Sequence, residues 1–154
     1  MRSSRLSKLL ILALLATAPV FAAEKKIARN QLPAAVQKTA EAQSAGATIH
    51  GYSQDREDGK LEYEVEMTFQ GHSKDVTIAP DGDLLEVEEQ VALDQLPASV
   101  QTALLAKAGK GSITKVESIM KHGALVAYEA QVATGAKHSE IQVGPAGQKL
   151  VHEE

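Results

Sequence analysis

Apolar and polar side chains alternate strictly between residues 61 and 69. An apolar residue at every second position predicts a β-strand with one face in a core and the other face toward solvent. The apolar positions are Leu61, Tyr63, Val65, Met67 and Phe69, and the polar positions are Glu62, Glu64, Glu66 and Thr68. A second stretch of this kind has apolar residues at Val126, Tyr128, Ala130 and Val132. The chain is therefore predicted to contain at least two half-buried strands.

Two other stretches have an apolar residue at every fourth position. These stripes are Leu32, Val36 and Ala40 in the first stretch and Leu96, Val100 and Leu104 in the second. The spacing predicts two short amphipathic helices. Pro33 and Pro97 suit a first helical turn, where the missing N–H costs nothing, and Gly46 and Gly109 are suitable stops. Because helices this short are marginal alone, we expect each stripe to pack on a strand.

The sequence also repeats itself. Residues 31–37, Gln-Leu-Pro-Ala-Ala-Val-Gln, recur 64 positions later as Gln-Leu-Pro-Ala-Ser-Val-Gln. After one extra residue the offset becomes 65, which pairs Tyr63 with Tyr128 and Gly82 with Gly147. The pattern indicates one unit of about sixty residues that is used twice.

Turn signals at residues 55–59, 70–71 and 80–82 separate the strands that follow the first helix. Short loops make neighbouring strands antiparallel. We therefore predict an α+β tandem repeat in which each unit has one helix followed by a four-stranded antiparallel sheet, with the helices on one sheet face. The chain is divided into a linker at 23–29, a first unit at 30–93 and a second unit at 94–154. The other sheet face is left to water or to a partner, and whether the two sheets join is left open.

The N-terminus has the features of a secretory signal peptide. Arg2, Arg5 and Lys8 form a positive region, an apolar run follows, and small residues lead up to Ala22. This order predicts export, with a signal peptide at residues 1–22. The apolar run is 15 residues long, shorter than the roughly 20 residues that a spanning helix needs. We expect no membrane span after cleavage and a location in the periplasm or outside the cell.

Composition narrows the class of protein further. The chain has 154 residues, with 16 Lys and Arg, 20 Asp and Glu, no Cys and no Trp. Without Cys, a disulfide, a thiol nucleophile and a Cys-ligated metal are excluded. An acidic protein does not suit the phosphates of nucleic acid, so we expect no nucleic-acid partner. The charge is uneven, because residues 30–93 hold 13 acidic and 4 basic residues, net −9, whereas residues 94–154 hold 6 of each.

Residues for catalysis or metal binding show no known arrangement. The five His residues have neither metal-ligand nor hydrolase spacing, so we expect no enzyme activity and no cofactor. Asp81 and Asp83 around Gly82 faintly suggest a calcium loop. The second unit, however, has Ala146 and Gln148 at the two matching positions, while the glycine persists. The pattern therefore favours a turn, and Asp81 and Asp83 are only weak metal candidates.

The strongest candidate for a binding site is the row of Glu62, Glu64 and Glu66. Period two places these side chains on the sheet face away from the helix. In the second unit Glu129 matches Glu64, whereas Ala and Gln replace the other two acids. An acidic surface can steer a cationic partner, so we expect the helix-free face to dock a basic patch on an exported protein. The alternatives are a plain solvated face and a periplasmic cation-binding or stress-buffering protein.

The order of the short motifs carries family information. Leu-Pro-Ala-x-Val lies on each helix, Asp58-Gly59-Lys60 leads to Tyr63-Glu64-Val65, and Pro80-Asp81-Gly82 precedes Leu84-Leu85. In this order the motifs resemble the PepSY-like, β-lactamase-inhibitor-like domain of bacterial secreted proteins, in two tandem copies. The resemblance implies a small α+β unit whose copies can line up into one curved antiparallel sheet. It also implies an inhibitor-like or propeptide-like module whose partner is an exported peptidase or another hydrolase.

Overall fold

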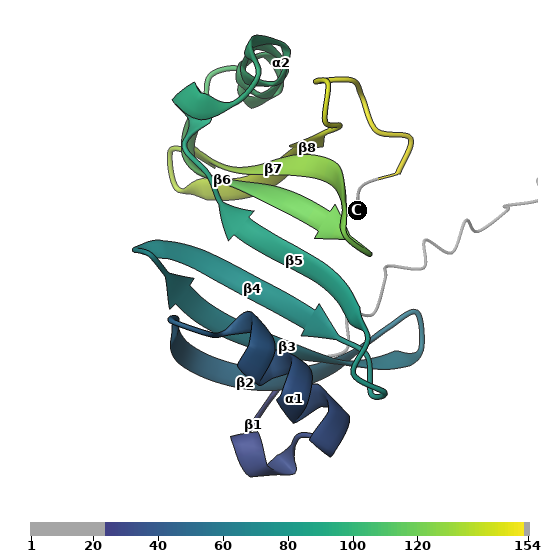
Figure 1. The fold of residues 1–154 in the computed structure, drawn as a ribbon. Helices are drawn as coiled ribbons and strands as arrows, with labels where there is room; N and C mark the ends of the chain where they lie inside the picture. Colours follow the sequence, from purple (N-terminus) through teal and green to yellow (C-terminus); the bar gives the residue numbers. More distant parts are fainter. Residues whose placement is uncertain (1–23, 153–154) are drawn as a thin grey trace, which may run out of the picture.

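The computed structural model describes residues 24–152, which form one antiparallel sheet of eight strands and two α-helices (Figure 1). The strands are β1 (Lys25–Ile27), β2 (Thr48–Glu57), β3 (Lys60–Phe69), β4 (His72–Ile78), β5 (Leu84–Gln90), β6 (Ser112–Lys121), β7 (Ala124–Thr134) and β8 (Lys137–Val143). The helices are α1 (Ala34–Gln43) and α2 (Ala98–Ala108), preceded by short 3-10 turns at Arg29–Gln31 and Leu93–Gln95. The strands follow one another in the sheet in chain order. The predicted signal peptide lies outside the described residues.

This architecture corrects the predicted one. The expectation of two units, each with one helix and its own four-stranded sheet, is wrong because β5 pairs with β6. The pairing runs from Glu86 opposite Lys121 to Gln90 opposite Glu117 and makes the sheet continuous. A separate first sheet would leave backbone groups of β5 unpaired at an edge, and β6 satisfies them.

The number of strands after the second helix also differs from the prediction. Four strands follow α1, but three follow α2 within the described residues. After β8 the chain turns back on itself, and the N–H of Gly144 donates to the carbonyl of Gln148 at 2.8 Å. The fourth strand predicted for the second unit is absent, since no described residue after Val143 lies in a strand. An additional strand lies at the other end, where Lys25–Ile27 pairs with β2.

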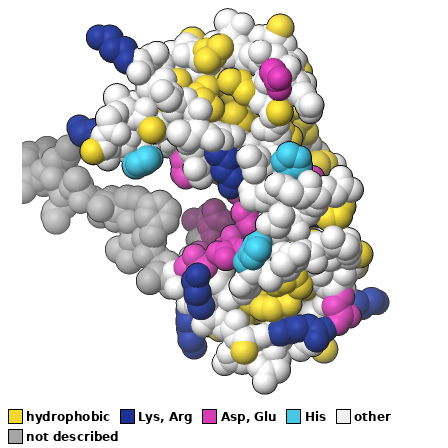
Figure 2. All heavy atoms as spheres, turned by 90° about the vertical axis from the view of Figure 1, so that its left-hand side faces the viewer, with side chains coloured by type: hydrophobic (Ala, Val, Ile, Leu, Met, Phe, Trp, Pro, Cys, Tyr) yellow, Lys and Arg dark blue, Asp and Glu magenta, His cyan; other side chains and the backbone are white. Residues whose placement is uncertain are grey.

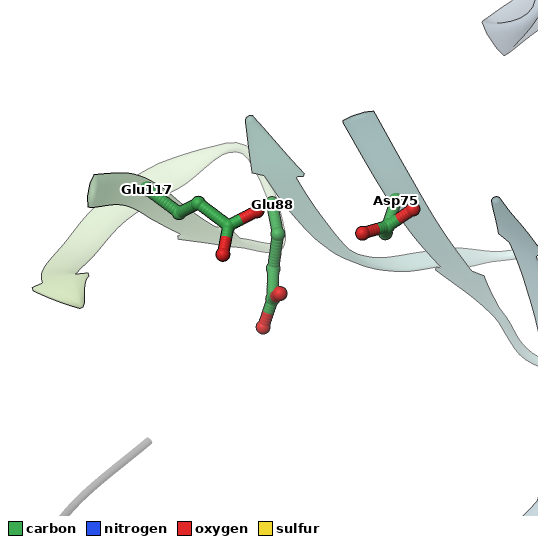
Figure 3. A group of neighbouring side chains, drawn as sticks. All are labelled: Asp75, Glu88 and Glu117. Atoms are coloured by element: carbon green, nitrogen blue, oxygen red, sulfur yellow. The ribbon is translucent and has the colours of Figure 1, made fainter. Parts of the chain in front are cut away.

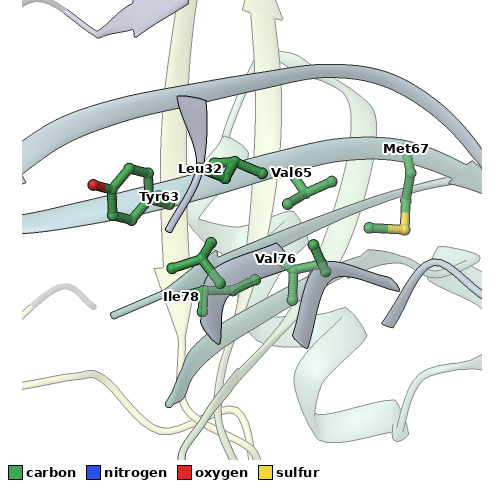
Figure 4. Close-up of a cluster of buried hydrophobic side chains, with 8 residues drawn as sticks. Leu32, Tyr63, Val65, Met67, Val76 and Ile78 are labelled. Carbon is green, nitrogen blue, oxygen red and sulfur yellow. The ribbon is translucent and has the colours of Figure 1, made fainter. Parts of the chain in front are cut away.

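Both helices pack on the same face of the sheet. The core under α1 contains Leu32, Val36, Ala40, Tyr63, Val65, Met67, Val76 and Ile78 (Figure 4). The core under α2 contains Leu96, Val100, Leu104, Val116, Tyr128, Ala130 and Val143. Val87 connects the two sides, because it stands opposite Val76 on β4 and opposite Met120 on β6. Burying one such aliphatic side chain stabilises the fold by roughly 1.5–3 kcal/mol.

Gly82 and Gly147 show why the turn glycine repeats while its acidic neighbours do not. Their φ angles are +94° and +82°, which glycine adopts without strain. A Cβ on Gly82 would lie 2.9 Å from the carbonyl oxygen of Ala35, and one on Gly147 would lie 2.5 Å from that of Ser99. Each turn therefore packs directly against the start of a helix, and glycine is required for this close approach.

The opposite face of the sheet carries no helix from residues 24–152, and we call it the helix-free face. In β2–β5 it presents Gly51, Ser53, Asp55, Glu57, Glu62, Glu64, Glu66, Asp75, Thr77, Glu86 and Glu88. In β6–β8 it presents Lys115, Glu117, Ile119, Lys121, Ala127, Glu129 and Gln142. Ile119 and Ala127 are 1% and 0% exposed although no helix core includes them. Neighbouring side chains therefore close over this face, which is hollowed rather than flat.

Candidate functional site

A row of polar side chains crosses the helix-free face. Ser53 stands opposite Glu64, Glu64 opposite Thr77, Thr77 opposite Glu86, and Glu86 opposite Lys121. Directly opposed residues on adjacent strands have Cβ atoms about 4.5–5.5 Å apart. Backbone pairing of five strands therefore holds these side chains next to one another.

A cavity of about 220 Å³ lies on this row. Figure 2 shows Asp and Glu side chains gathered in a hollow in the middle of one side of the molecule. The cavity is lined by Ser53, Asp55, Glu57, Glu62, Tyr63, Glu64, Thr77, Glu86 and Glu88. Six of these nine residues are acidic and none is basic. Carboxylates held this close repel one another, and partial burial reduces the screening by water.

Glu64 shows the effect of this surrounding most clearly. Burial disfavours the charged form of its side chain and raises its pKa to about 7. The carboxylates of Glu24, Asp75, Glu66 and Asp55 add to the rise, in that order. The proton on Glu64 is therefore held near neutral pH, where an ordinary glutamic acid has lost it.

Glu88 is affected in the same direction. Burial raises the pKa of this carboxyl to about 8, and a hydrogen bond and the charge of Glu86 contribute next. The carboxylates of Glu117 and Glu129 add to the rise. Burial is also the main cause that raises the pKa of Glu62. A cation in the cavity would oppose all of these shifts, because it favours the charged carboxylates.

Ser53 is a buried polar side chain without a partner. The residue is 3% exposed, and its Oγ has no hydrogen-bond partner among the described residues. Leaving a buried hydroxyl unsatisfied costs about 1–3 kcal/mol. Because Ser53 lines the cavity opposite Glu64, its hydroxyl faces the same space as the carboxylates. A group bound there would gain a hydrogen bond that the free protein does not make.

Three carboxylates converge beside the cavity. Asp75 of β4, Glu88 of β5 and Glu117 of β6 each place an oxygen within 4.8 Å of the others (Figure 3). Such oxygens suit a hard cation. However, Nζ of Lys115 lies 2.5 Å from Oε1 of Glu117, and Oγ of Ser73 donates to the same oxygen at 3.3 Å. This group of carboxylates therefore already has an ammonium group of the protein beside it.

Lys115 has no counterpart in the first half of the sheet. It follows a β-bulge, since the pairing of β6 with β7 shifts between Ile113 and Lys115. The matching shift in β2 lies between Ile49 and Gly51, which places Gly51 at the equivalent position. A Cβ on Gly51 would lie 3.3 Å from Oε2 of Glu66. The second half thus supplies a cation to its own face from a position at which the first half has glycine.

The structure places the predicted site residues in three different surroundings. Glu62 and Glu64 line the cavity. Glu66 is on the same face, opposite Gly51, but outside the lining. Glu129 lies farther away on β7, where its Oε2 accepts a hydrogen bond of 2.8 Å from Nε2 of Gln142. Their binding role stays a prediction.

Asp81 and Asp83 lie elsewhere, in the turn between β4 and β5. Both are exposed, and Oδ1 of Asp81 accepts a hydrogen bond of 3.2 Å from the backbone N–H of Asp83. They are not part of the group of converging carboxylates found in residues 24–152. Their local geometry is that of a side chain that stabilises its own turn.

Sequence analysis missed Ser53, Thr77, Glu86 and Glu88. A signal existed for the two glutamates, because Leu85 and Val87 alternate with them. Ser53 had no such signal, since the residues around it show no clear period. Its position in the site depends on the register between β2 and β3.

The fold is similar to solved structures of Bacteroides proteins. A Bacteroides eggerthii protein, whose name places it in the periplasm, matches with a TM-score of 0.63 and 20% identity over 76% of this chain and 84% of that one. A BLIP-like protein from Bacteroides fragilis matches with a TM-score of 0.57 and 20% sequence identity, over 79% of this chain and 85% of that one. A DUF2874 family protein from Bacteroides uniformis matches with a TM-score of 0.60 and 15% sequence identity, over 78% of this chain and 86% of that one. At these identities the likeness shows a BLIP-like fold and nothing finer.

No family model matches the chain. None of the curated proteins matches it either.

Proposed function

We propose that this protein is an exported, non-enzymatic binding module that docks a basic segment of a protein partner on its helix-free face. The acidic cavity carries the proposal, because among residues 24–152 six carboxylates and no basic residue line it. Complementary charge steers two proteins together and excludes partners of the wrong sign. A basic segment would also relieve the repulsion among the carboxylates.

The surroundings of the cavity support a peptide segment as the docked element. A second cavity of about 580 Å³ shares Glu57, Glu62, Thr77 and Glu86 with the first. It adds apolar surface from Leu61, Ala79, Pro80 and Leu85. Interfaces combine an apolar centre with polar groups that fix orientation. The two cavities together suit a segment in which a basic residue is next to an apolar one.

The predicted residues have defined parts in this proposal. Glu62 and Glu64 contact the basic segment, and Glu66 extends the acidic surface along β3. Glu129 lies at the margin, where Gln142 already donates a hydrogen bond to it. Asp81 and Asp83 have no part in docking.

Export and family relationship belong to the proposal as well. The pattern of residues 1–22 supports export, and the name of the Bacteroides eggerthii protein supports the periplasm. A relation to PepSY-like domains, with copies at 30–93 and 94–154, is supported by the matching bulges of β2 and β6. The BLIP-like neighbour supports an exported peptidase or another hydrolase as the class of partner.

A crosslinking pull-down from periplasmic extract, followed by binding measurements with the purified captured protein, tests the proposal. The test variant carries Glu62→Gln, Glu64→Gln and Glu66→Gln together. A matched control carries Glu41→Gln, Glu89→Gln and Asp94→Asn, which change the charge equally outside the helix-free face. We expect the test variant to bind at least about tenfold more weakly, with the control unchanged. Equal affinity of both variants for the captured protein would refute docking on this face.

Cation binding is the second candidate, and one observation favours it. The oxygens of Asp75, Glu88 and Glu117 lie within 4.8 Å of one another. The ammonium group of Lys115 beside Glu117 opposes it, since it occupies the place of a metal charge. Calorimetric titration with calcium alone separates the two functions. Saturable calcium binding that is lost in Asp75→Asn, together with no protein partner, would favour the second candidate.

A further inference from the structure

The cavity has six carboxylates and no basic side chain among the described residues that line it. Of its six carboxylates, Glu86 has a cation nearby, with Nζ of Lys121 at 3.4 Å from its Oε2. Lys60 and Lys121 line the adjoining cavity rather than this one. Lys26 stands opposite Ser53 on the edge strand β1 and is exposed. The space between Ser53 and Glu64 is therefore bordered by acceptors, and the Ser53 hydroxyl has no partner there.

The size and shape of the cavity argue against a bare metal ion. Its volume of about 220 Å³ corresponds to roughly seven water molecules, whereas a dehydrated ion needs ligands that converge at 2.3–2.6 Å. Among the described residues, converging carboxylates occur at Asp75, Glu88 and Glu117. Two of these three are outside the cavity lining. The cavity therefore suits a larger cation that carries several donors.

The second half of the sheet shows how this face is neutralised from within. There, Lys115 extends from the position after the β6 bulge to Glu117, at 2.5 Å. Glu117 is also the counterpart of Ser53, since each lies two residues after the equivalent position of its bulge. The first half has Gly51 in place of the lysine. It therefore lacks the cation that Lys115 supplies from this position in the second half.

An arginine side chain matches these requirements better than a lysine. Its guanidinium group is planar, has five N–H donors and is weakly hydrated, so it loses less on entering a part-buried site. It can donate to a carboxylate and a hydroxyl at once, because its donors point in several directions. A lysine ammonium is a strongly hydrated point charge on a flexible stem.

We propose that the cavity lined by Ser53, Glu64 and Glu88 receives the guanidinium group of an arginine from the docked partner. The guanidinium donates to the carboxylates of Glu64 and Glu88 and to Oγ of Ser53. This inference rests on the proposed function and names the residue that the partner inserts. Ser53 is then a recognition residue, because its unpartnered hydroxyl gains a hydrogen bond only in the complex.

NMR titration of the isotope-labelled protein with N-acetyl-arginine amide tests the chemistry of the cavity without the partner. The amides of Ser53, Glu64 and Thr77 are followed at constant ionic strength. The corresponding citrulline derivative has nearly the same shape without the charge, and lysine amide and calcium chloride are further probes. We expect saturable shifts with the arginine derivative and at least about tenfold weaker binding of the citrulline derivative. Equal or stronger effects of citrulline, lysine or calcium at these amides, or no shift with arginine up to its solubility, would overturn the inference.

Two variants locate the interaction. Ser53→Ala should bind the arginine derivative about three- to tenfold more weakly, whereas Ser118→Ala, a serine on the other face that bonds the carbonyl of Glu89, should not change. Gly51→Lys should place an internal ammonium group at the cavity and weaken binding about tenfold, and Gly51→Ala controls for the added Cβ. If Gly51→Lys does not give a folded spectrum, the comparison of Ser53→Ala with Ser118→Ala alone decides whether the arginine derivative binds at the cavity. Unchanged affinity in Ser53→Ala would contradict the assignment.

The outcome can be separated from that of the proposed function. If the triple glutamine variant loses its partner but the arginine derivative does not bind, docking stands and the arginine inference is wrong. If the arginine derivative binds at the cavity but the triple variant keeps its partner, docking on this face is refuted. The inference that this partner inserts an arginine is then wrong as well.

Discussion

Ser53 and Glu64 are cross-strand partners whose side chains meet in the acidic cavity. The hydroxyl of Ser53 has no hydrogen-bond partner in the part of the chain that the structure describes, and burial raises the pKa of Glu64 to about 7. Both features lower the stability of the free protein at neutral pH. Residues with such a cost are typical of sites that serve binding rather than folding.

Replacing Ser53 by alanine should therefore not weaken the fold. We expect Ser53→Ala to raise the free energy of unfolding by about 1 kcal/mol, because it removes a buried hydroxyl that is unsatisfied. Urea unfolding measures the change. Ser73→Ala is the comparison, since its hydroxyl donates to Glu117, and we expect that variant to lose about 1 kcal/mol. A loss in Ser53→Ala as large as that in Ser73→Ala would show that the Ser53 hydroxyl is satisfied.

Stability should fall as pH rises through neutrality. Glu64 and Glu88 have folded-state pKa values of about 7 and about 8, above the ordinary value of glutamic acid. The folded state therefore keeps protons that the unfolded chain has released. The stability that these protons contribute is fully present in acid and is lost as pH rises through the two pKa values. We expect the free energy of unfolding to drop by about 2 kcal/mol between about pH 5 and pH 9, a figure reduced for solvent screening of side chains that are partly exposed.

Urea unfolding of the double variant Glu64→Gln and Glu88→Gln checks this assignment. Its stability should depend less on pH than that of the unchanged protein, and it should be the more stable of the two at high pH. The charges of Glu24 and Asp75 raise the pKa of Glu64, and the charge of Glu86 raises that of Glu88. An equally steep pH dependence in the double variant would show that Glu64 and Glu88 do not cause the effect.

Removing Lys115 should be costly. Its ammonium group lies 2.5 Å from Glu117, whose side chain is 5% exposed. Loss of one partner leaves the other charge buried without compensation. We expect Lys115→Met to lower the free energy of unfolding by about 3 kcal/mol. Lys121→Met is the control at the more exposed pair with Glu86, where we expect about 1 kcal/mol; equal losses would contradict the different burial of the two pairs.

Gly147 should tolerate no side chain. A Cβ there would lie 2.5 Å from the carbonyl oxygen of Ser99 and would also require a positive φ. We expect Gly147→Ala to destabilise the protein by about 3 kcal/mol, through strain and a shift of α2. Gly123→Ala has a similar φ of +79° and no atom within 4 Å, so its cost should stay near 1 kcal/mol. Thermal unfolding of both variants compares the cost of a positive φ alone, in Gly123→Ala, with the cost of a positive φ plus steric overlap, in Gly147→Ala.

Local patterns predicted much of the fold because their residues act locally. The stripes with Val36 and Val100 marked α1 and α2, and strict alternation marked β3 with the outward direction of Glu62 and Glu64. The pairing of β5 with β6 could not be predicted in the same way, because the periodicity of a strand does not indicate which other strand pairs with it. Three residues are likewise too few to show a period, so the sequence predicts a linker where the structure has β1.

The candidate site was only partly predictable for a related reason. Glu86 and Glu88 reach the cavity because β4 pairs with β5 in one particular register, which shifts at Thr77 and Ile78. Ser53 reaches it because a bulge after Ile49 resets the register of β2. A shift by one residue moves every side chain to the other face. Sequence alternation defines the two faces of a strand, but loops and bulges determine which residues of neighbouring strands lie opposite one another.

The sequential order of the eight strands has a consequence for how the chain acquires its structure. Every strand after the first pairs with the one that precedes it in the chain, and the connections between β1 and β2 and between β5 and β6 each contain a helix. A short loop costs less entropy to close than a long one. The ladders β2–β5 and β6–β8 can therefore form before β5 joins β6, and this last pairing covers an edge of each ladder.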